Sequence, residues 1–117
     1  MVLTKTPICN FGEKAKNFNL ISTENKKISL ESVRGKNGTL IMFICNHCPY
    51  VKAIIKDVVE DTKYLGSLGV MSVAIMPNDV KNYPEDSFEN MNVFAKNNNF
   101  SFPYLYCLLY TSDAADE

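Results

Sequence analysis

The stretch that decides the fold is residues 39–51, which read TLIMFICNHCPYV. Its first six residues are mostly apolar, do not alternate with polar ones and favour β-structure, a pattern typical of a strand buried on both faces. From Val51 to Leu65, apolar residues then recur at helical spacing. This pattern predicts an amphipathic helix over about residues 48–68, ending near Gly69.

A second apolar run follows at residues 70–76, so strand, helix and strand form one βαβ unit. Because such crossovers are right-handed, the two strands are expected to be parallel and to lie near each other in one sheet. Residues 100–106 predict the start of a third parallel strand. Shorter strand-like runs at residues 18–21 and 27–30 flank a turn-forming cluster and predict an N-terminal hairpin.

A second helix is predicted after residue 86, where one face carries only apolar side chains. The residues on that face are Phe88, Met91, Phe94 and Ala95. Asp86 and Glu89 have the spacing of a capping box, so Asp86 is expected to cap this helix. The sequence therefore predicts an α/β fold with a mostly parallel central sheet, flanking helices and an N-terminal β-hairpin.

Length and charge narrow the class of protein. A chain of 117 residues is expected to form one domain. With 12 basic and 13 acidic residues intermixed, it offers no electrostatic footprint for nucleic acid or an anionic membrane surface. No apolar run reaches the roughly 18 residues of a membrane span, and the first residues lack the apolar core of a secretory signal. A cytoplasmic location is expected.

The last eleven residues, 107–117, break the pattern of the rest of the chain. They read CLLYTSDAADE and continue neither a helical nor a strand period. The string resembles the translation of a transposase adaptor used in sequencing libraries, so we expect a domain over residues 1–106 and a non-native read-through tail over residues 107–117. A natural acidic tail is the alternative.

The chemistry is expected at Cys45 and Cys48, between the carboxyl end of a central strand and the amino end of a helix. The helix amino end presents unpaired N–H groups and a partial positive charge, which are expected to lower the pKa of a cysteine there. In thiol–disulfide exchange, Cys45 would attack a substrate disulfide and Cys48 would resolve the mixed disulfide. His47, as a cation or hydrogen-bond donor, would stabilise the Cys45 thiolate.

Two other readings of the same residues stay open. Peroxide reduction needs only that one of the two cysteines passes through sulfenic acid. A non-enzymatic metal-binding module could use Cys45, His47 and Cys48, with Cys9 as a fourth ligand, and its soft thiolates would suit copper(I). The acidic residues that follow the second strand, which are Asp79, Glu85 and Asp86, are interpreted as turn and capping residues.

The segment FICNHCPYVK at residues 43–52, preceded by the hairpin and by Arg34-Gly35-Lys36, resembles the thioredoxin-like redoxins grouped with the alkyl hydroperoxide reductase/thiol-specific antioxidant proteins. Residues 76–79, MPND, and residues 82–86, NYPED, look like the same subgroup. The resemblance covers residues 11–106. It implies a thioredoxin fold, a redox-active dithiol, no bound cofactor, disulfides or peroxides as substrates, and a thiol electron donor.

The sequence departs from this family pattern in two ways. The cis-proline strand, terminal hairpin and last helix of thioredoxin-like proteins are absent, and Pro103 lies too early to replace that proline. In addition, peroxiredoxins carry threonine three residues before the attacking cysteine, where Met42 precedes Cys45 here. The second departure favours disulfide exchange over peroxide reduction.

Overall fold

The computed structural model describes residues 11–77 and 81–107. Within these ranges, five strands form one sheet, joined by two α-helices and two short 3₁₀ turns. Along the chain the elements are β1 (Asn19–Ser22), β2 (Lys27–Ser29), η1 (Glu31–Val33), β3 (Gly38–Phe43), α1 (Pro49–Ser67), β4 (Val70–Met76), η2 (Pro84–Asp86), α2 (Phe88–Asn97) and β5 (Tyr104–Tyr106). Cys9, Asp79 and residues 108–117 of the predicted tail lie outside the described residues.

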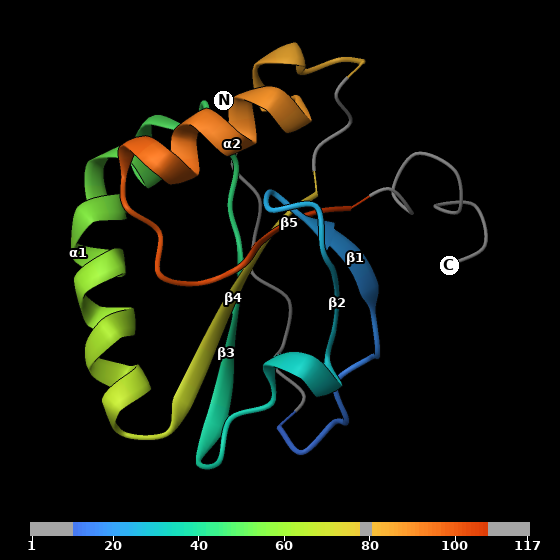
Figure 1. Ribbon diagram of the computed structural model, residues 1–117, viewed down its shortest axis with the longest axis vertical. Coiled ribbons are helices and arrows are strands. Elements are labelled where there is room, and N and C mark those ends of the chain that lie inside the picture. Colours follow the sequence, from blue (N-terminus) through green and yellow to red (C-terminus); the bar gives the residue numbers. More distant parts are fainter. Residues whose placement is uncertain (1–10, 78–80, 108–117) are drawn as a thin grey trace.

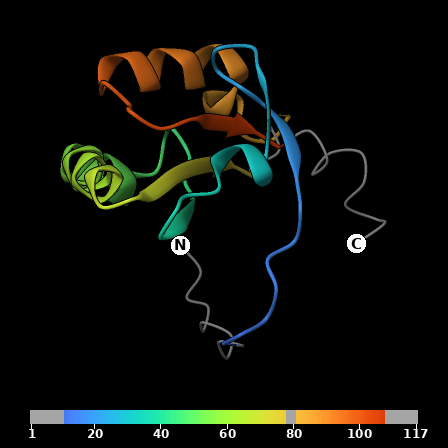
Figure 2. The same ribbon diagram turned by 60° about the horizontal axis from the view of Figure 1, so that its bottom comes forward.

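The sheet has the order β2-β1-β5-β4-β3 (Figures 1 and 2). β3, β4 and β5 run parallel, whereas β1 is antiparallel to both β2 and β5. The predicted βαβ unit and N-terminal hairpin are confirmed, with the β4 bounds as expected. The third parallel strand is shorter than predicted. The architecture is a mixed α/β thioredoxin-like fold, as the sequence predicts.

The position of β3 differs from the prediction. A strand buried on both faces was expected here, but β3 lies at the edge of the sheet formed by the described residues, and its only strand partner is β4. Leu40 remains 38% exposed and Phe43 68% exposed. The central strand is β5, which lies between β1 and β4, so β4 has a partner on both sides and β3 is left at the edge. Residues 72–76 of β4 are all buried.

Alternate side chains of β4 point into two apolar cores, as the period of a strand requires. Ala74 and Met76 belong to the core that both helices cover, together with Ile55, Val59, Met91, Phe102 and Tyr104. Val73 and Ile75 belong to the other core, which also contains Leu20, Val33 and Leu105. The predicted apolar face of α2 is confirmed by Met91, which is fully buried, and by Phe94, which packs against the first core.

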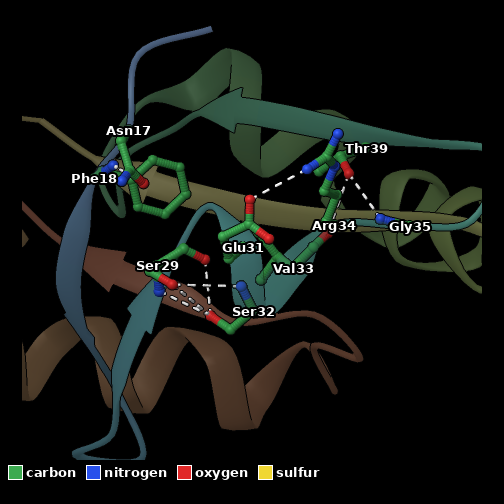
Figure 3. Close-up of polar contacts among 9 residues, drawn as sticks. All are labelled: Asn17, Phe18, Ser29, Glu31, Ser32, Val33, Arg34, Gly35 and Thr39. Atoms are coloured by element: carbon green, nitrogen blue, oxygen red, sulfur yellow. Dashed lines mark hydrogen bonds and ion pairs between the residues drawn. The ribbon is translucent and has the colours of Figure 1, made fainter.

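A compact loop leads from η1 into β3 (Figure 3). The Thr39 hydroxyl donates to the carbonyl of Val33 at 3.1 Å and accepts from the Gly35 N–H at 3.0 Å. Arg34 pairs with Glu31 at 3.1 Å on the exposed side. A side chain at position 35 would collide with backbone, since a Cβ there would lie 2.7 Å from the Met71 nitrogen. This loop therefore fixes where β3 starts.

The turn into α1 carries the candidate site. α1 begins with Pro49 in its first turn, where a missing N–H costs least, and Cys48 is its N-cap. The helix ends before Gly69, whose φ of +84° favours glycine. None of the helices among residues 11–77 and 81–107 has both the length and the apolar character that a bilayer crossing requires.

Candidate functional site

The cysteine turn, residues 45–48, joins the carboxyl end of β3 to the amino end of α1. This edge also receives η2, which follows β4, so two segments far apart in the sequence lie side by side near the start of α1 (Figure 1). Cys45 follows the last residues of β3 and Cys48 is the N-cap of α1, so both cysteines belong to one short turn. Both side chains are half-buried.

A buried carboxylate from η2 holds this turn in place. The Asp86 side chain is 0% exposed, and its Oδ1 accepts a hydrogen bond from the Asn46 backbone N–H at 2.7 Å. Its other oxygen, Oδ2, lies 2.8 Å from Nδ1 of His47. A hydrogen bond to an ionised group is among the stronger polar contacts in proteins. One carboxylate therefore contacts two consecutive residues of the cysteine turn.

Asn46 links the turn to the sheet through its side chain. Its Oδ1 accepts a hydrogen bond from the Tyr104 hydroxyl at 2.7 Å, and its Nδ2 donates to the Glu85 carbonyl at 3.0 Å. Burial, followed by the nearby charge of Asp86, raises the pKa of Tyr104 above its ordinary value. The phenol therefore keeps its proton and can donate it to Asn46.

The ring of His47 lies between this buried network and solvent. It stacks on Tyr83, with ring centroids 5.5 Å apart and planes 12° from parallel, and its side chain is 32% exposed. Nδ1 is buried and forms no hydrogen bond with any described residue, although Asp86 Oδ2 is only 2.8 Å away. The two atoms are close, but they are not aligned as donor and acceptor.

The protonation of Cys45 differs from the prediction. Burial raises the pKa of the Cys45 thiol, and the negative charge of Asp86 adds to the rise, while backbone hydrogen bonds from Cys48 and His47 oppose it. The expected lowering of the Cys45 pKa rested on the helix amino end and on stabilisation of the thiolate by His47. The sequence did not reveal that Cys45 is partly desolvated beside a buried carboxylate.

The three predicted site residues, Cys45, His47 and Cys48, lie together in the turn. Cys45 and Cys48 are free thiols and are not at disulfide distance. One sulfur, one ring nitrogen and one carboxylate oxygen lie within 4.8 Å of one another, contributed by Cys45, His47 and Asp86. Cys48 is not part of this cluster, and the fourth ligand considered from the sequence, Cys9, lies outside the described residues.

Asp86 is the main residue that sequence reasoning placed wrongly. The helix cap is its neighbour Ser87, whose side chain accepts a hydrogen bond from the Asn90 N–H at 3.2 Å. The carboxylate of Asp86 turns inward instead, because the buried Asn46 N–H, 40 residues earlier, supplies its partner. Tyr104 was missed for the same reason: its role depends on a hydrogen bond between residues far apart in the chain.

Comparisons with known proteins place the chain in one family. The model of the AhpC/TSA family matches residues 11–106. No curated protein sequence is detectably similar to the chain. Among solved structures, an uncharacterized conserved protein from Geobacillus kaustophilus is 37% identical with a TM-score of 0.85, and the match covers 97% of this chain and 62% of that one.

Two further solved structures share the fold at lower identity. A thiol:disulfide interchange protein of the thioredoxin family from Chlorobium tepidum is 21% identical with a TM-score of 0.64, covering 80% of this chain and 59% of that one. A peroxidoxin from Mycobacterium tuberculosis is 16% identical with a TM-score of 0.68, covering 88% and 62%. The chain thus spans about three fifths of the length of these relatives. By its sequence from residue 11 to 106 and by its thioredoxin-like fold, the chain belongs to the AhpC/TSA family.

Proposed function

We propose that the chain catalyses thiol–disulfide exchange in the cytoplasm, with Cys45 as the attacking thiol, Cys48 as the resolving thiol and His47 as the group that assists proton transfer. The observation that carries this proposal is the cysteine turn itself. Cys45 and Cys48 both lie, half-buried, in the short turn between β3 and the first turn of α1. Membership of a redox-active family supports the same chemistry.

The exchange proceeds in two balanced steps. The Cys45 thiolate attacks one sulfur of a protein or small-molecule disulfide, forms a mixed disulfide and releases one substrate thiolate, which takes up a proton. Cys48, as a thiolate, then attacks the Cys45 sulfur and releases the second substrate thiol. Two electrons and two protons pass from the dithiol to the substrate. A separate thiol donor returns Cys45 and Cys48 to the reduced state.

Separate thiols in the structure are compatible with this cycle, because they correspond to the reduced form of the pair. The sulfur of Cys45 lies within 4.8 Å of a His47 ring nitrogen. At that range the ring can stabilise negative charge on the sulfur, through a proton that it carries, without a large movement of the backbone. Closing the disulfide then requires the two thiol side chains to approach each other.

The test is to equilibrate the full chain in graded glutathione buffers and follow the masses of its peptides. Cys9→Ser and Cys107→Ser are introduced so that only Cys45 and Cys48 can react. A reversible loss of two hydrogens from this pair, at a potential between about −270 and −120 mV, is expected. In Cys48→Ser, a glutathione adduct should accumulate on Cys45.

Two results would contradict the proposal. If no intramolecular disulfide forms while the chain remains folded, dithiol exchange is wrong. If peroxide is consumed rapidly and this activity survives Cys48→Ser, the chain is a peroxidase that uses Cys45 alone.

A further inference from the structure

We propose that the reduced chain binds one Zn²⁺ ion through the Cys45 sulfur, the Nδ1 atom of His47 and the carboxylate of Asp86. These three groups come from the cysteine turn and from η2, and their donor atoms lie within 4.8 Å of one another. The inference does not rest on thiol–disulfide exchange, but a zinc ion bound to the Cys45 sulfur would occupy the thiolate that attacks a disulfide.

The spacing of the three donors is close to what a zinc ion requires. Zinc binds thiolate sulfur at about 2.3 Å and imidazole nitrogen or carboxylate oxygen at about 2.0–2.2 Å, so tetrahedral ligand atoms lie roughly 3.3–3.8 Å apart. The pair of Nδ1 and Oδ2, at 2.8 Å, has to open slightly, and the Cys45 sulfur lies within 4.8 Å of a His47 ring nitrogen and an Asp86 carboxylate oxygen.

The orientation of His47 supports a third atom between the two side chains. Its Nδ1 is buried, lies 2.8 Å from Asp86 Oδ2 and yet forms no hydrogen bond with a described residue. Buried polar nitrogens are nearly always satisfied. A metal ion bound by both Nδ1 and Oδ2 would satisfy the nitrogen, and it would also explain why the two atoms lie close together without a hydrogen bond.

Asp86 is already held as a metal ligand would be. Its Oδ1 accepts from the Asn46 N–H at 2.7 Å, which leaves Oδ2 directed toward His47. Ligating carboxylates are commonly fixed by such a second hydrogen bond, which sets the orientation of the ligand. The Asn46 side chain is fixed in turn by the Tyr104 hydroxyl at 2.7 Å.

The donor set selects the kind of metal. One thiolate, one imidazole and one carboxylate form the mixed sulfur, nitrogen and oxygen set that zinc accepts. The carboxylate disfavours copper(I), which prefers soft ligands, and the thiolate disfavours magnesium and calcium. A bound Zn²⁺ would also balance the negative charges of a Cys45 thiolate and the Asp86 carboxylate. Three protein ligands leave a fourth position for water.

The experiment titrates the reduced full chain with Co²⁺, whose absorption reports its ligands, and then displaces it with Zn²⁺. One ion per chain is expected, with a thiolate-to-cobalt band that is lost in Cys45→Ser. Asp86→Asn should weaken cobalt affinity at least about tenfold. Glu85→Gln, at the exposed neighbouring carboxylate, is the matched control and should bind as the unsubstituted chain does.

Cys48→Ser distinguishes this site from one with two thiolate ligands. The Cys48→Ser chain should still bind one cobalt ion and show the thiolate-to-cobalt band. Binding that is lost in Cys48→Ser but unchanged in Asp86→Asn would overturn the proposal. Because Asp86→Asn can also disturb folding, X-ray absorption of the zinc-loaded unsubstituted chain provides an independent test: one sulfur ligand is expected, and two sulfurs would overturn the assignment. A failure to bind metal would leave the glutathione test of thiol exchange unaffected.

Discussion

The two segments that meet at the site, residues 45–48 and residues 83–86, differ in how they contribute. The first carries the reactive sulfurs, is half-buried and is recognisable from its sequence. The second carries the buried carboxylate of Asp86 and the stacked ring of Tyr83, and its local pattern does not reveal which contacts these two side chains make. The reactive side chains can therefore be recognised from the local sequence. Their arrangement, in contrast, depends on a hydrogen bond to a residue 40 positions away in the chain.

The largest effect is expected from removing the reactive atom of the first segment. Cys45→Ser should abolish exchange with glutathione disulfide, because a serine hydroxyl neither attacks a disulfide nor forms a mixed disulfide. Reduction of a chromogenic disulfide measures this, with Cys107→Ser as the control that removes a thiol elsewhere. Exchange that persists in Cys45→Ser would show that another cysteine of the chain is the nucleophile.

The next largest effect is expected from the second segment, and it should appear as a loss of stability. Asp86→Ala removes the acceptor of the buried Asn46 N–H and should cost about 1–3 kcal/mol of unfolding free energy. Urea unfolding measures the change, and Glu85→Ala, at an exposed side chain, should change it little. Equal effects of the two substitutions would mean that Asp86 does not hold the cysteine turn.

A smaller effect is expected at the link between the turn and β5. Tyr104→Phe deletes the hydroxyl that donates to Asn46 Oδ1 at 2.7 Å, but it keeps the buried ring. The loss of one buried hydrogen bond should lower the unfolding free energy by about 1 kcal/mol. Tyr64→Phe, which removes a hydroxyl from an exposed ring on α1, is the matched control and should be neutral.

The smallest effect is expected from the exposed ring of the second segment. Tyr83→Ala removes the stacking on His47 and should cost about 0.5 kcal/mol, since Tyr83 is 47% exposed. Thermal unfolding compared with Tyr64→Ala separates the stacking from the general loss of an exposed aromatic ring. If Tyr83→Ala lowered the unfolding free energy as much as Asp86→Ala does, the Tyr83 ring would contribute as much to stability as the buried carboxylate.

The sequence predicts those parts of the fold that depend on local patterns. The continuous apolar run of β4 and the helical spacing in α1, with Pro49 and Gly69 near its ends, place these elements to within a residue or two. The edge position of β3 was not predictable, because an apolar run indicates burial but does not say which strands will be neighbours. That order depends on β5, whose pairing with β1 and β4 joins residues far apart in the chain.

The candidate site likewise has a part that local sequence patterns predict and a part that they do not. Cys45, His47 and Cys48 could be identified from their spacing after a strand and before a helix, and the structure brings them together in one turn. Asp86 and Glu89 have the spacing of a capping box, but the helix cap in the structure is the neighbouring residue Ser87. The choice between the two was made by the buried Asn46 N–H, a partner that no local pattern contains.

The place of β5 between β1 and β4 has a consequence for how the chain folds while the ribosome makes it. Ile21 pairs with Tyr106, and Ile75 pairs with Leu105, so the hairpin and the βαβ unit stay separate sheets until β5 has emerged. Until then the nascent chain exposes the apolar side chains that β5 will cover, and such exposure invites association. The emergence of β5 therefore joins the two sheets and forms the Tyr104 contact to the site in one event.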